Sequence, residues 1–177
     1  VILLAHPNIK GSQANKALID AVSDMEGVAV FNLYELSQEI AFNVDEWSKI
    51  ISDASAVIYQ FPFYWMSAPS LLKKWQDEVF TFLSKTPAVA GKTLTVVTTT
   101  GSEYEAYRSG GRNRFTTDEL LRPYQVSAIH SGMSWQTPIV VYGMGTADAG
   151  KNIAEGANLY KQRVEMLIGS SNAGNNW

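Results

Sequence analysis

Short apolar runs alternate with longer segments of helical spacing along the chain, and this alternation restricts the fold more than any other feature. The first run, residues 1–5 (VILLA), is apolar at every position, as in a strand that is buried on both faces. Similar runs follow at 28–31, 56–61, 94–99 and 136–142. Because such strands need cover on both faces, each run is predicted to form one strand of a sheet that lies between helices.

The segments between these runs carry apolar residues three or four positions apart, which predicts helices. Their starts have capping residues such as Ser12, Asp45 and Thr116. The predicted helices lie between Ser12 and Gly27, from Asp45 to Ala54, from Ser67 to Phe82, from Thr116 to Gly132 with a bend at Pro123, and from Asp148 to Ile168. In the third of these, the apolar face is predicted to include Trp75, Val79 and Phe82.

Strands and helices in this order predict a single α/β domain, residues 1–169, built as a three-layer sandwich. The five-stranded parallel sheet of this class has the order 2-1-3-4-5. Its ligands bind at the carboxyl ends of the strands, where the order reverses. The segments to examine are therefore 6–15, 62–67 and 98–107. Residues 170–177, rich in Gly, Ser and Asn, are predicted to form a loose tail.

The composition excludes several classes of site and partner. The chain has 0 Cys and 2 His, without the spacing of metal ligands, so no metal site is predicted. With 14 Lys and Arg against 17 Asp and Glu, its formal net charge is −3, which argues against nucleic acid as a partner. No apolar run is long enough to span a membrane, and the first is too short for a signal-peptide core. The protein is therefore expected in the cytoplasm.

The segment after the first strand, HPNIKGSQAN, has the composition of an anion site. The start of a helix offers backbone N–H groups without partners and a partial positive charge. His6, Ser12 and Asn15 add side-chain donors, and Lys10 adds charge. Neither GxGxxG nor GxxxxGK[ST] is present, which excludes the dinucleotide fingerprint and the ATP-type loop. The segment is interpreted either as a phosphate site or as an ordinary helix cap.

Three consecutive aromatic residues, Phe63, Tyr64 and Trp65, follow the third strand. Successive side chains of an extended chain point to opposite faces, so the three cannot all lie in the core. At least one is expected to line a surface cleft, where its face would stack on a flat conjugated ligand. A place in the core is the alternative for any one of them.

Hydroxyl side chains and a glycine end the fourth strand, in the segment TTTGSEYEAY. Backbone N–H groups near Gly101 can donate to the polar edge of a ligand, and Tyr104 and Tyr107 can cover it or donate to it. An ordinary polar loop is the alternative. The hypothesis of a site depends on all three segments meeting at the same edge of the sheet.

Several motifs, in order along almost the whole chain, resemble those of one enzyme family. They are AHP at 5–7 with SQAN at 12–15, QFPFYW at 60–65 with PSLLKKW at 69–75, TTTG at 98–101 with AYRSGG at 106–111, and DELLRP at 118–123 with GM at 132–133. The sequence resembles the flavodoxin-like NAD(P)H:quinone oxidoreductases. Its motifs are most similar to those of the small bacterial members, which include the ancillary flavoprotein of the glutathione-gated potassium efflux system and the modulator-of-drug-activity type reductases.

The resemblance implies a flavodoxin-like fold and a flavin-dependent two-electron reductase. It places the flavin phosphate on the first loop, the flavin ring on the second and the polar edge of the ring on the third. Together with Tyr104 as a cover, the implied cofactor-binding residues are His6, Ser12, Gln13, Ala14, Asn15, Pro62, Phe63, Tyr64, Trp65, Met66, Thr98, Thr99, Thr100 and Gly101.

The catalytic roles implied by the resemblance fall to Tyr107, Gly101 and Asn113. In the larger relatives a Tyr at the position of Tyr107 polarises the flavin or quinone oxygen, paired with a His some six positions on. Here that position holds Asn113, a departure from the family pattern. Backbone N–H groups at Thr100, Gly101 and Ser102 are expected to stabilise negative charge on the reduced ring.

The resemblance also suggests the cofactor, substrates and assembly. FMN is favoured over FAD because the chain is short and no insertion is seen that would cradle an adenosine. NAD(P)H is the expected reductant. A quinone-like compound, or an azo or nitro compound, is the expected acceptor, and the two substrates take turns in a ping-pong cycle. The family further implies a homodimer with each flavin at the interface.

Three other functions stay open on the sequence alone. The first is a regulatory subunit that binds a membrane transporter and keeps a secondary reductase activity, as the potassium-efflux relatives suggest. The second is a one-electron carrier of the flavodoxin type, for which a hydroxyl- and Gly-rich phosphate loop and a strongly acidic surface are expected. The third is a flavin-free module that binds another flat ligand.

Overall fold

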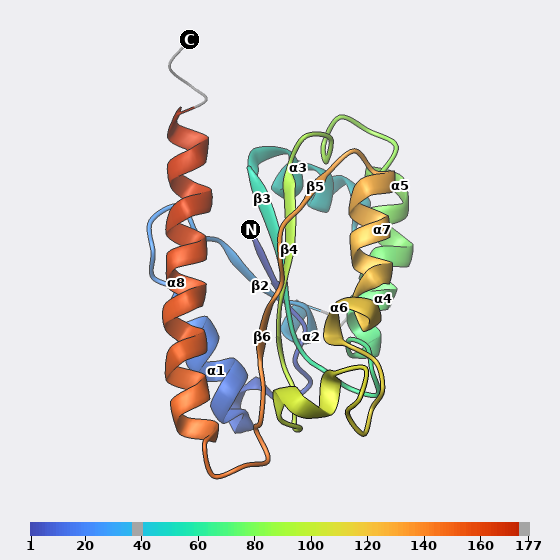
Figure 1. Ribbon diagram of the computed structural model, residues 1–177. Helices are drawn as coiled ribbons and strands as arrows, with labels where there is room; N and C mark the ends of the chain where they lie inside the picture. Colours follow the sequence, from blue (N-terminus) through green and yellow to red (C-terminus); the bar gives the residue numbers. More distant parts are fainter. Residues whose placement is uncertain (37–40, 174–177) are drawn as a thin grey trace.

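The computed structural model describes residues 1–36 and 41–173, and at its centre lies a parallel β-sheet (Figure 1). The order of the sheet is β2-β1-β3-β4-β5, with β6 also paired to β4, and every pairing is parallel. The predicted order 2-1-3-4-5 is thereby confirmed. The strands are β1 (Ile2–Leu4), β2 (Val30–Asn32), β3 (Ala56–Pro62), β4 (Thr93–Thr99), β5 (Ser134–Trp135) and β6 (Ile139–Val141).

The fifth position in the sheet, predicted as one strand over 136–142, is divided between two short strands. β5 pairs with the start of β4, and β6 pairs with its end. Between them Pro138 has no N–H to donate to the ladder. The carbonyls of Gln136 and Thr137 instead lie near the Thr95 hydroxyl, at 3.4 and 3.3 Å.

Helices cover both faces of the sheet, which confirms the predicted flavodoxin-like sandwich (Figure 1). On one face lie α1 (Gln13–Asp20) and α8 (Ala149–Ala173). On the other lie α3 (Val44–Asp53), α4 (Ser70–Trp75), α5 (Thr81–Leu83) and α7 (Arg122–His130). Shorter elements are α2 (Leu33–Leu36), α6 (Thr117–Leu120) and the 3₁₀ turns η1 (Ile9–Gly11) and η3 (Tyr104–Tyr107).

The two layers of core differ in chemistry. The core under α1 and α8 is aliphatic apart from Tyr160. At Gly156 an added Cβ would lie 2.4 Å from Val141 Cγ2, so this glycine lets α8 approach β6 closely. The other core is rich in aromatic rings, among them Trp47 and Trp75, whose centroids are 5.3 Å apart in an edge-to-face contact.

Helix starts agree with the predicted caps at two places and differ at a third. Ser12 caps α1, and Thr116 caps α6 through a capping box with Glu119. The cap of α3 is Asn43 rather than Asp45, because the side chain of Asn43 accepts N–H groups of the first turn. Asp45 lies inside that turn, where its negative charge favours the positive end of the helix dipole.

The helix predicted over 67–82 begins at Ser70 and contains a π-helical segment, η2 (Gln76–Phe80). A π-helical turn holds more residues than an α-helical turn, so later side chains lag behind the α-helical period. Phe82, predicted on the apolar face, is therefore 58% exposed, and Leu83 is buried in its place.

The last helix is longer than predicted. α8 continues to Ala173, past the predicted domain end at 169 and into the segment predicted as a loose tail. In this part of the helix the Ser170 hydroxyl donates to the Met166 carbonyl (2.8 Å), so the serine is accommodated within the helix. Residues 174–177 of the predicted tail lie outside the described residues.

Two properties of the described residues bear on possible partners. No helix in ranges 1–36 and 41–173 is long and apolar enough to cross a membrane. Across the same ranges, no group of three or more His, Asp or Glu side chains is arranged to hold a metal ion.

Candidate functional site

Three segments meet at the carboxyl edge of the sheet, the lower edge in Figure 1, where the chain leaves β1, β3 and β4. Backbone hydrogen bonds join them just beyond the strands. The Ala5 N–H donates to the Gln60 carbonyl (2.8 Å), and the Phe63 N–H donates to the Thr99 carbonyl (2.9 Å). The expectation that the three loops share one edge is confirmed.

The loop between β1 and α1 is held by its own side chains. Nδ1 of His6 accepts the N–H of Asn8 (3.0 Å), and Oδ1 of Asn8 accepts the N–H of Gly11 (3.1 Å). Ser12 Oγ then accepts the N–H of Asn15 (3.1 Å). Burial lowers the pKa of His6, so its ring is neutral near pH 7 and offers its Nε2–H as a donor. The first-turn N–H groups of α1 are thus presented by an ordered loop.

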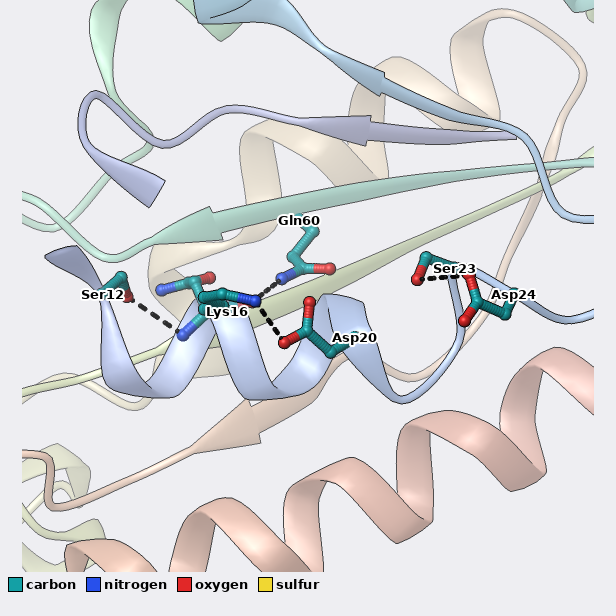
Figure 2. A network of polar contacts seen from close by, with 7 residues as sticks. Ser12, Lys16, Asp20, Ser23, Asp24 and Gln60 are labelled. Carbon is teal, nitrogen blue, oxygen red and sulfur yellow. Dashed lines mark hydrogen bonds and ion pairs between the residues drawn. The ribbon is translucent and has the colours of Figure 1, made fainter. Parts of the chain in front are cut away.

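A pair of buried amides ties this loop to β3 and β4. Figure 2 shows Gln60 reaching towards α1, where its Nε2 donates to the Asn15 carbonyl (2.9 Å). Asn15 Nδ2 donates to Thr99 Oγ1 (3.0 Å). The side chains of Asn15 and Gln60 are at most 1% exposed. Their oxygens, Asn15 Oδ1 and Gln60 Oε1, have no hydrogen-bond partner. Orphaned buried acceptors of this kind fit a ligand that carries hydroxyl donors.

The aromatic segment after β3 forms a tight turn with an unusual backbone. Tyr64 and Ser67 bond to each other twice, N–H to carbonyl, at 2.8 and 3.0 Å. Between them Trp65 and Met66 have φ angles of 47° and 63°, a left-handed conformation that Gly and Asn occupy more readily. This conformation costs roughly 1–2 kcal/mol for each such residue. Backbone strain of this kind concentrates at functional sites.

The side chains of this turn face outwards. Trp65 is 97% exposed, and Tyr64 and Met66 are 47% and 42% exposed. Phe63 packs against the core, with its ring centroid 6.1 Å from that of Tyr107. The prediction that the three consecutive aromatics cannot all be core residues is confirmed, and Trp65 offers an open aromatic face at this edge.

Tyr124 of α7, which is distant in sequence, contacts the end of the turn. Its hydroxyl accepts the Ala68 N–H (3.2 Å) and lies 3.4 Å from Ser67 Oγ. The Tyr124 ring is buried against Phe61 and Tyr59, at centroid distances of 5.5 and 6.2 Å. A buried side chain from a distant part of the sequence therefore fixes the strained turn.

The end of β4 offers fewer free donors than predicted. The Thr98 hydroxyl is fully buried and donates to the Phe61 carbonyl (2.8 Å). The Thr100 N–H, just beyond the end of β4, donates to the Val141 carbonyl (2.9 Å). The side chain of Thr98 and the backbone N–H of Thr100 are therefore engaged within the protein and are not free to donate to a ligand. Gly101 has open space where a Cβ would lie.

Tyr107 lies in η3 with its ring packed against Phe63 and Tyr142, at centroid distances of 6.1 and 5.9 Å. Burial raises the pKa of Tyr107, and the nearby Ser102, Arg112 and Thr100 side chains act in the opposite direction. The hydroxyl therefore keeps its proton near pH 7, which makes it a candidate hydrogen-bond donor to a ligand.

A groove of about 500 Å³ runs along the outer edge of β6, between α8 and the turn that contains Tyr104. Tyr104, 52% exposed, makes an edge contact with Tyr142 at 5.3 Å between centroids. The Tyr142 hydroxyl is paired with Thr117 Oγ1 (2.6 Å). Through Tyr104 and Tyr107 the groove adjoins the candidate site.

Apart from Asn113, the predicted residues lie at the carboxyl ends of β3 and β4, in the loops after β1, β3 and β4, in the first turn of α1 and in η3. Asn113 is half-buried in the following loop, and its N–H donates to the Ala106 carbonyl (3.0 Å). Sequence reasoning missed the side chains of Gln60, Ser102 and Tyr124. A polar residue inside an apolar strand is a signal that could have found Gln60. The other two act through contacts that no local pattern reveals.

Comparison with known proteins gives the family. A model described as flavodoxin-like fold matches residues 1–164. The chain is 35% identical over 170 residues to general stress protein 14 of Bacillus subtilis (strain 168), and this match covers 94% of this chain and 97% of that protein. It is 35% identical over 146 residues to the glutathione-regulated potassium-efflux system ancillary protein KefG of Serratia proteamaculans (strain 568), with 80% of each chain covered.

Two solved structures are similar in both fold and sequence. General stress protein 14 of Treponema denticola, in complex with FMN, gives a TM-score of 0.85 at 30% identity and covers 94% of this chain and 97% of its own. An NADPH-quinone reductase from P. pentosaceus gives 0.77 at 28% identity, covering 92% and 95%. Because the family model matches nearly the whole of this chain, the chain belongs to the flavodoxin-like NAD(P)H oxidoreductase family.

Proposed function

We propose that the protein is an FMN-dependent NAD(P)H oxidoreductase that reduces quinones, or related azo or nitro compounds, by two electrons in a ping-pong cycle. When bound, FMN supplies the redox chemistry, because it takes two electrons from NAD(P)H and gives them to the acceptor. One observation carries the proposal: the anion site at the start of α1 and the open aromatic turn after β3 lie on one sheet edge. The buried amides of Asn15 and Gln60 tie this edge together.

The residues at this edge fit FMN part by part. The phosphate suits the first-turn N–H groups of α1, with Ser12 and the Nε2–H of His6 beside them. Ribityl hydroxyls supply the donors that the orphaned oxygens of Asn15 and Gln60 lack. The flat ring suits the exposed face of Trp65. FMN rather than FAD is further supported by the Treponema relative, which is described in complex with FMN.

The protein's own groups hold and polarise the reactants. The absence of a side chain at Gly101 leaves room for a polar ligand edge to approach the backbone. Tyr107 donates a hydrogen bond to the oxygen of the acceptor, since burial keeps its hydroxyl protonated. Asn113 takes a structural role through its backbone, in place of the His that larger relatives carry.

The test is a visible absorption spectrum of the purified protein before and after addition of FMN. We expect about one flavin per chain, bleached by NAD(P)H and recoloured by a soluble benzoquinone, with released flavin identified by mass. Parallel initial-rate lines at several quinone concentrations would support the ping-pong order. Flavin that binds but is not reduced by NAD(P)H would favour the one-electron carrier. Failure to bind FMN or FAD would favour a flavin-free module.

A second function, regulation of a potassium-efflux system, is favoured by the 35% identity to KefG over 80% of the chain. The matching test is potassium flux through a reconstituted glutathione-gated efflux protein, with and without this chain. Stimulated flux that persists with Tyr107→Phe would support a regulatory role separate from reductase turnover. Unchanged flux, together with quinone turnover, would leave the free-standing reductase.

We also infer a homodimer that works in the cytoplasm. Exposed apolar side chains on α5 and α7 offer a surface for pairing, namely Phe82, Val126 and Ile129, which are 58%, 60% and 63% exposed. Light scattering of the purified protein is expected to give twice the chain mass, and Ile129→Asp is expected to reduce it. Cell fractionation with antibody detection tests the location.

A further inference from the structure

The loop that follows η3, residues 108–114, is folded back tightly onto that turn. The Asn113 N–H donates to the Ala106 carbonyl (3.0 Å). A Cβ at Gly111 would lie 2.1 Å from the Glu105 carbonyl oxygen, so a glycine is required at this close approach. Between these two anchored positions lies a single residue, Arg112, whose direction is set by the loop.

Arg112 reaches back to the candidate site. Its Nη2 donates a hydrogen bond to Ser102 Oγ, ten residues earlier in the chain. The side chains of Ser102 and Thr100 lie beside the Tyr107 hydroxyl, where each lowers the pKa of Tyr107. Arg112, Ser102 and Tyr107 therefore form a chain of polar groups that ends at the phenol oxygen.

The chemistry of these groups fixes the direction of the hydrogen bonds. A guanidinium carries donors only, so Ser102 Oγ accepts from Arg112 and keeps its own hydrogen for Tyr107. The Thr100 hydroxyl already donates to the Ser102 carbonyl (2.8 Å), so it has no hydrogen left for Tyr107. Ser102 is thus placed to donate to Tyr107 Oη, and Tyr107 keeps its own proton for an acceptor.

The charges around Tyr107 act in opposite directions. Glu103, immediately before η3, disfavours a negative charge on the Tyr107 phenol, and Arg112 favours it. Tyr142 packs against the ring from the end of β6, and its hydroxyl is held by Thr117 (2.6 Å). Among these groups, Arg112 supplies the positive charge.

We propose that Arg112 is a positioning residue that acts through Ser102 to hold Tyr107 Oη and to stabilise negative charge on it. The inference rests on the proposed function, in which Tyr107 donates to the oxygen of the acceptor. In the proton step the O–H bond of Tyr107 breaks, an O–H bond forms on the reduced acceptor, and water returns the proton to Tyr107. Arg112 stays protonated throughout and lowers the cost of the transient anion.

The first test measures Tyr107 itself, without turnover. Tyrosine is labelled with ¹³C at Cζ, and the Tyr107 signal is assigned by its loss in Tyr107→Phe. We expect Arg112→Gln to lower the ionisation constant of Tyr107 by about three- to tenfold. Arg114→Gln, which removes the same charge from the same loop, is expected to change it less than about twofold. An equal change in both variants, or none in either, would overturn the proposal.

The second test measures turnover of the FMN-loaded protein with NAD(P)H and a soluble benzoquinone. Arg112→Gln is expected to lower kcat by about tenfold, with FMN affinity and the KM for NAD(P)H retained, and Arg112→Lys to restore part of the rate. A wild-type protein without turnover would refute the proposed function, while the NMR titration would still test the coupling. A wild-type protein that turns over, with Arg112→Gln identical to it, would refute the coupling alone.

Discussion

The loop after β1 and the turn after β3 lie at the same edge of the sheet but are held in opposite ways. In the loop, His6, Asn8 and Ser12 accept N–H groups only two or three residues away. In the turn, Trp65 and Met66 adopt a left-handed backbone that Tyr124, 56 residues from Ala68, helps to hold. Local sequence therefore orders the segment that presents backbone N–H groups, and tertiary contacts order the one that presents aromatic faces.

The largest effect is expected when the hydrogen bond from the Ala68 N–H to the Tyr124 hydroxyl is removed. Tyr124→Phe keeps the buried ring but leaves the Ala68 N–H without its partner, which should lower the free energy of unfolding by about 1–2 kcal/mol and weaken FMN binding. Urea denaturation and flavin titration measure the two effects. The matched control is Tyr160→Phe, because the buried Tyr160 hydroxyl has no hydrogen-bond partner. Equal losses in both variants would show that the Tyr124 hydroxyl does not support the turn.

The local support of the loop is tested at Ser12. Ser12→Ala removes the cap of α1 and should lower the free energy of unfolding by about 1 kcal/mol. Ser12→Asp retains a cap, so stability should be kept, but its carboxylate repels a phosphate and FMN affinity should fall by about tenfold. Denaturation and flavin titration separate the two roles. Tight FMN binding by Ser12→Asp would mean that the phosphate lies elsewhere.

The strained backbone of the turn predicts that a substitution there raises the free energy of unfolding of the flavin-free protein. Trp65→Gly relieves a positive φ and removes almost no buried surface, so the flavin-free protein should gain about 0.5–1 kcal/mol after the entropy cost of Gly. The same change removes the exposed ring and should weaken FMN binding. Thermal unfolding with and without FMN gives both quantities. A loss of stability without FMN would show that the turn is not strained in solution.

The smallest effect concerns pH and the loop. The pKa of His6 is lowered in the folded protein, so the unfolded chain binds the proton more readily. Stability is therefore unaffected by His6 above its unfolded pKa of about 6.5 and falls as the pH drops below that value. Protonation also removes the acceptor for the Asn8 N–H. His6→Gln should flatten this decline between pH 7 and 5 by less than about 1 kcal/mol, as measured by denaturation at each pH. An unchanged slope would contradict the assignment.

Much of the fold follows from local patterns. The apolar runs predicted the strands, and Ser12 and Thr116 marked two helix starts, because buried strands and caps depend on neighbouring residues. The order of the strands followed from the fold class. The divided fifth strand had a local signal as well, since Pro138 lies inside the strand predicted over 136–142. The exposure of Phe82 had none, because it depends on the π-helical segment before it.

The site was predictable as a place but not as a set of contacts. The topology brings the three loops to one edge, and that much follows from the fold class. The contacts that order the site join distant residues, such as Gln60 with Asn15 and Arg112 with Ser102. Thr98 and Thr100 show the converse, since hydroxyls and N–H groups that look available in a sequence are used by neighbouring strands.

The outer edge of the sheet is a poor template for strands of other molecules. An exposed edge strand normally offers a row of unpaired backbone groups, which invites edge-to-edge aggregation. Here β6 is three residues long, and Pro138 removes a donor next to it. Arg163 Nη1 binds the Thr137 carbonyl (2.7 Å), and Asn152 Nδ2 binds the Tyr142 carbonyl (2.9 Å). With both ends of β6 closed by side chains, this edge of the sheet is poorly suited to fibre-like stacking with other chains.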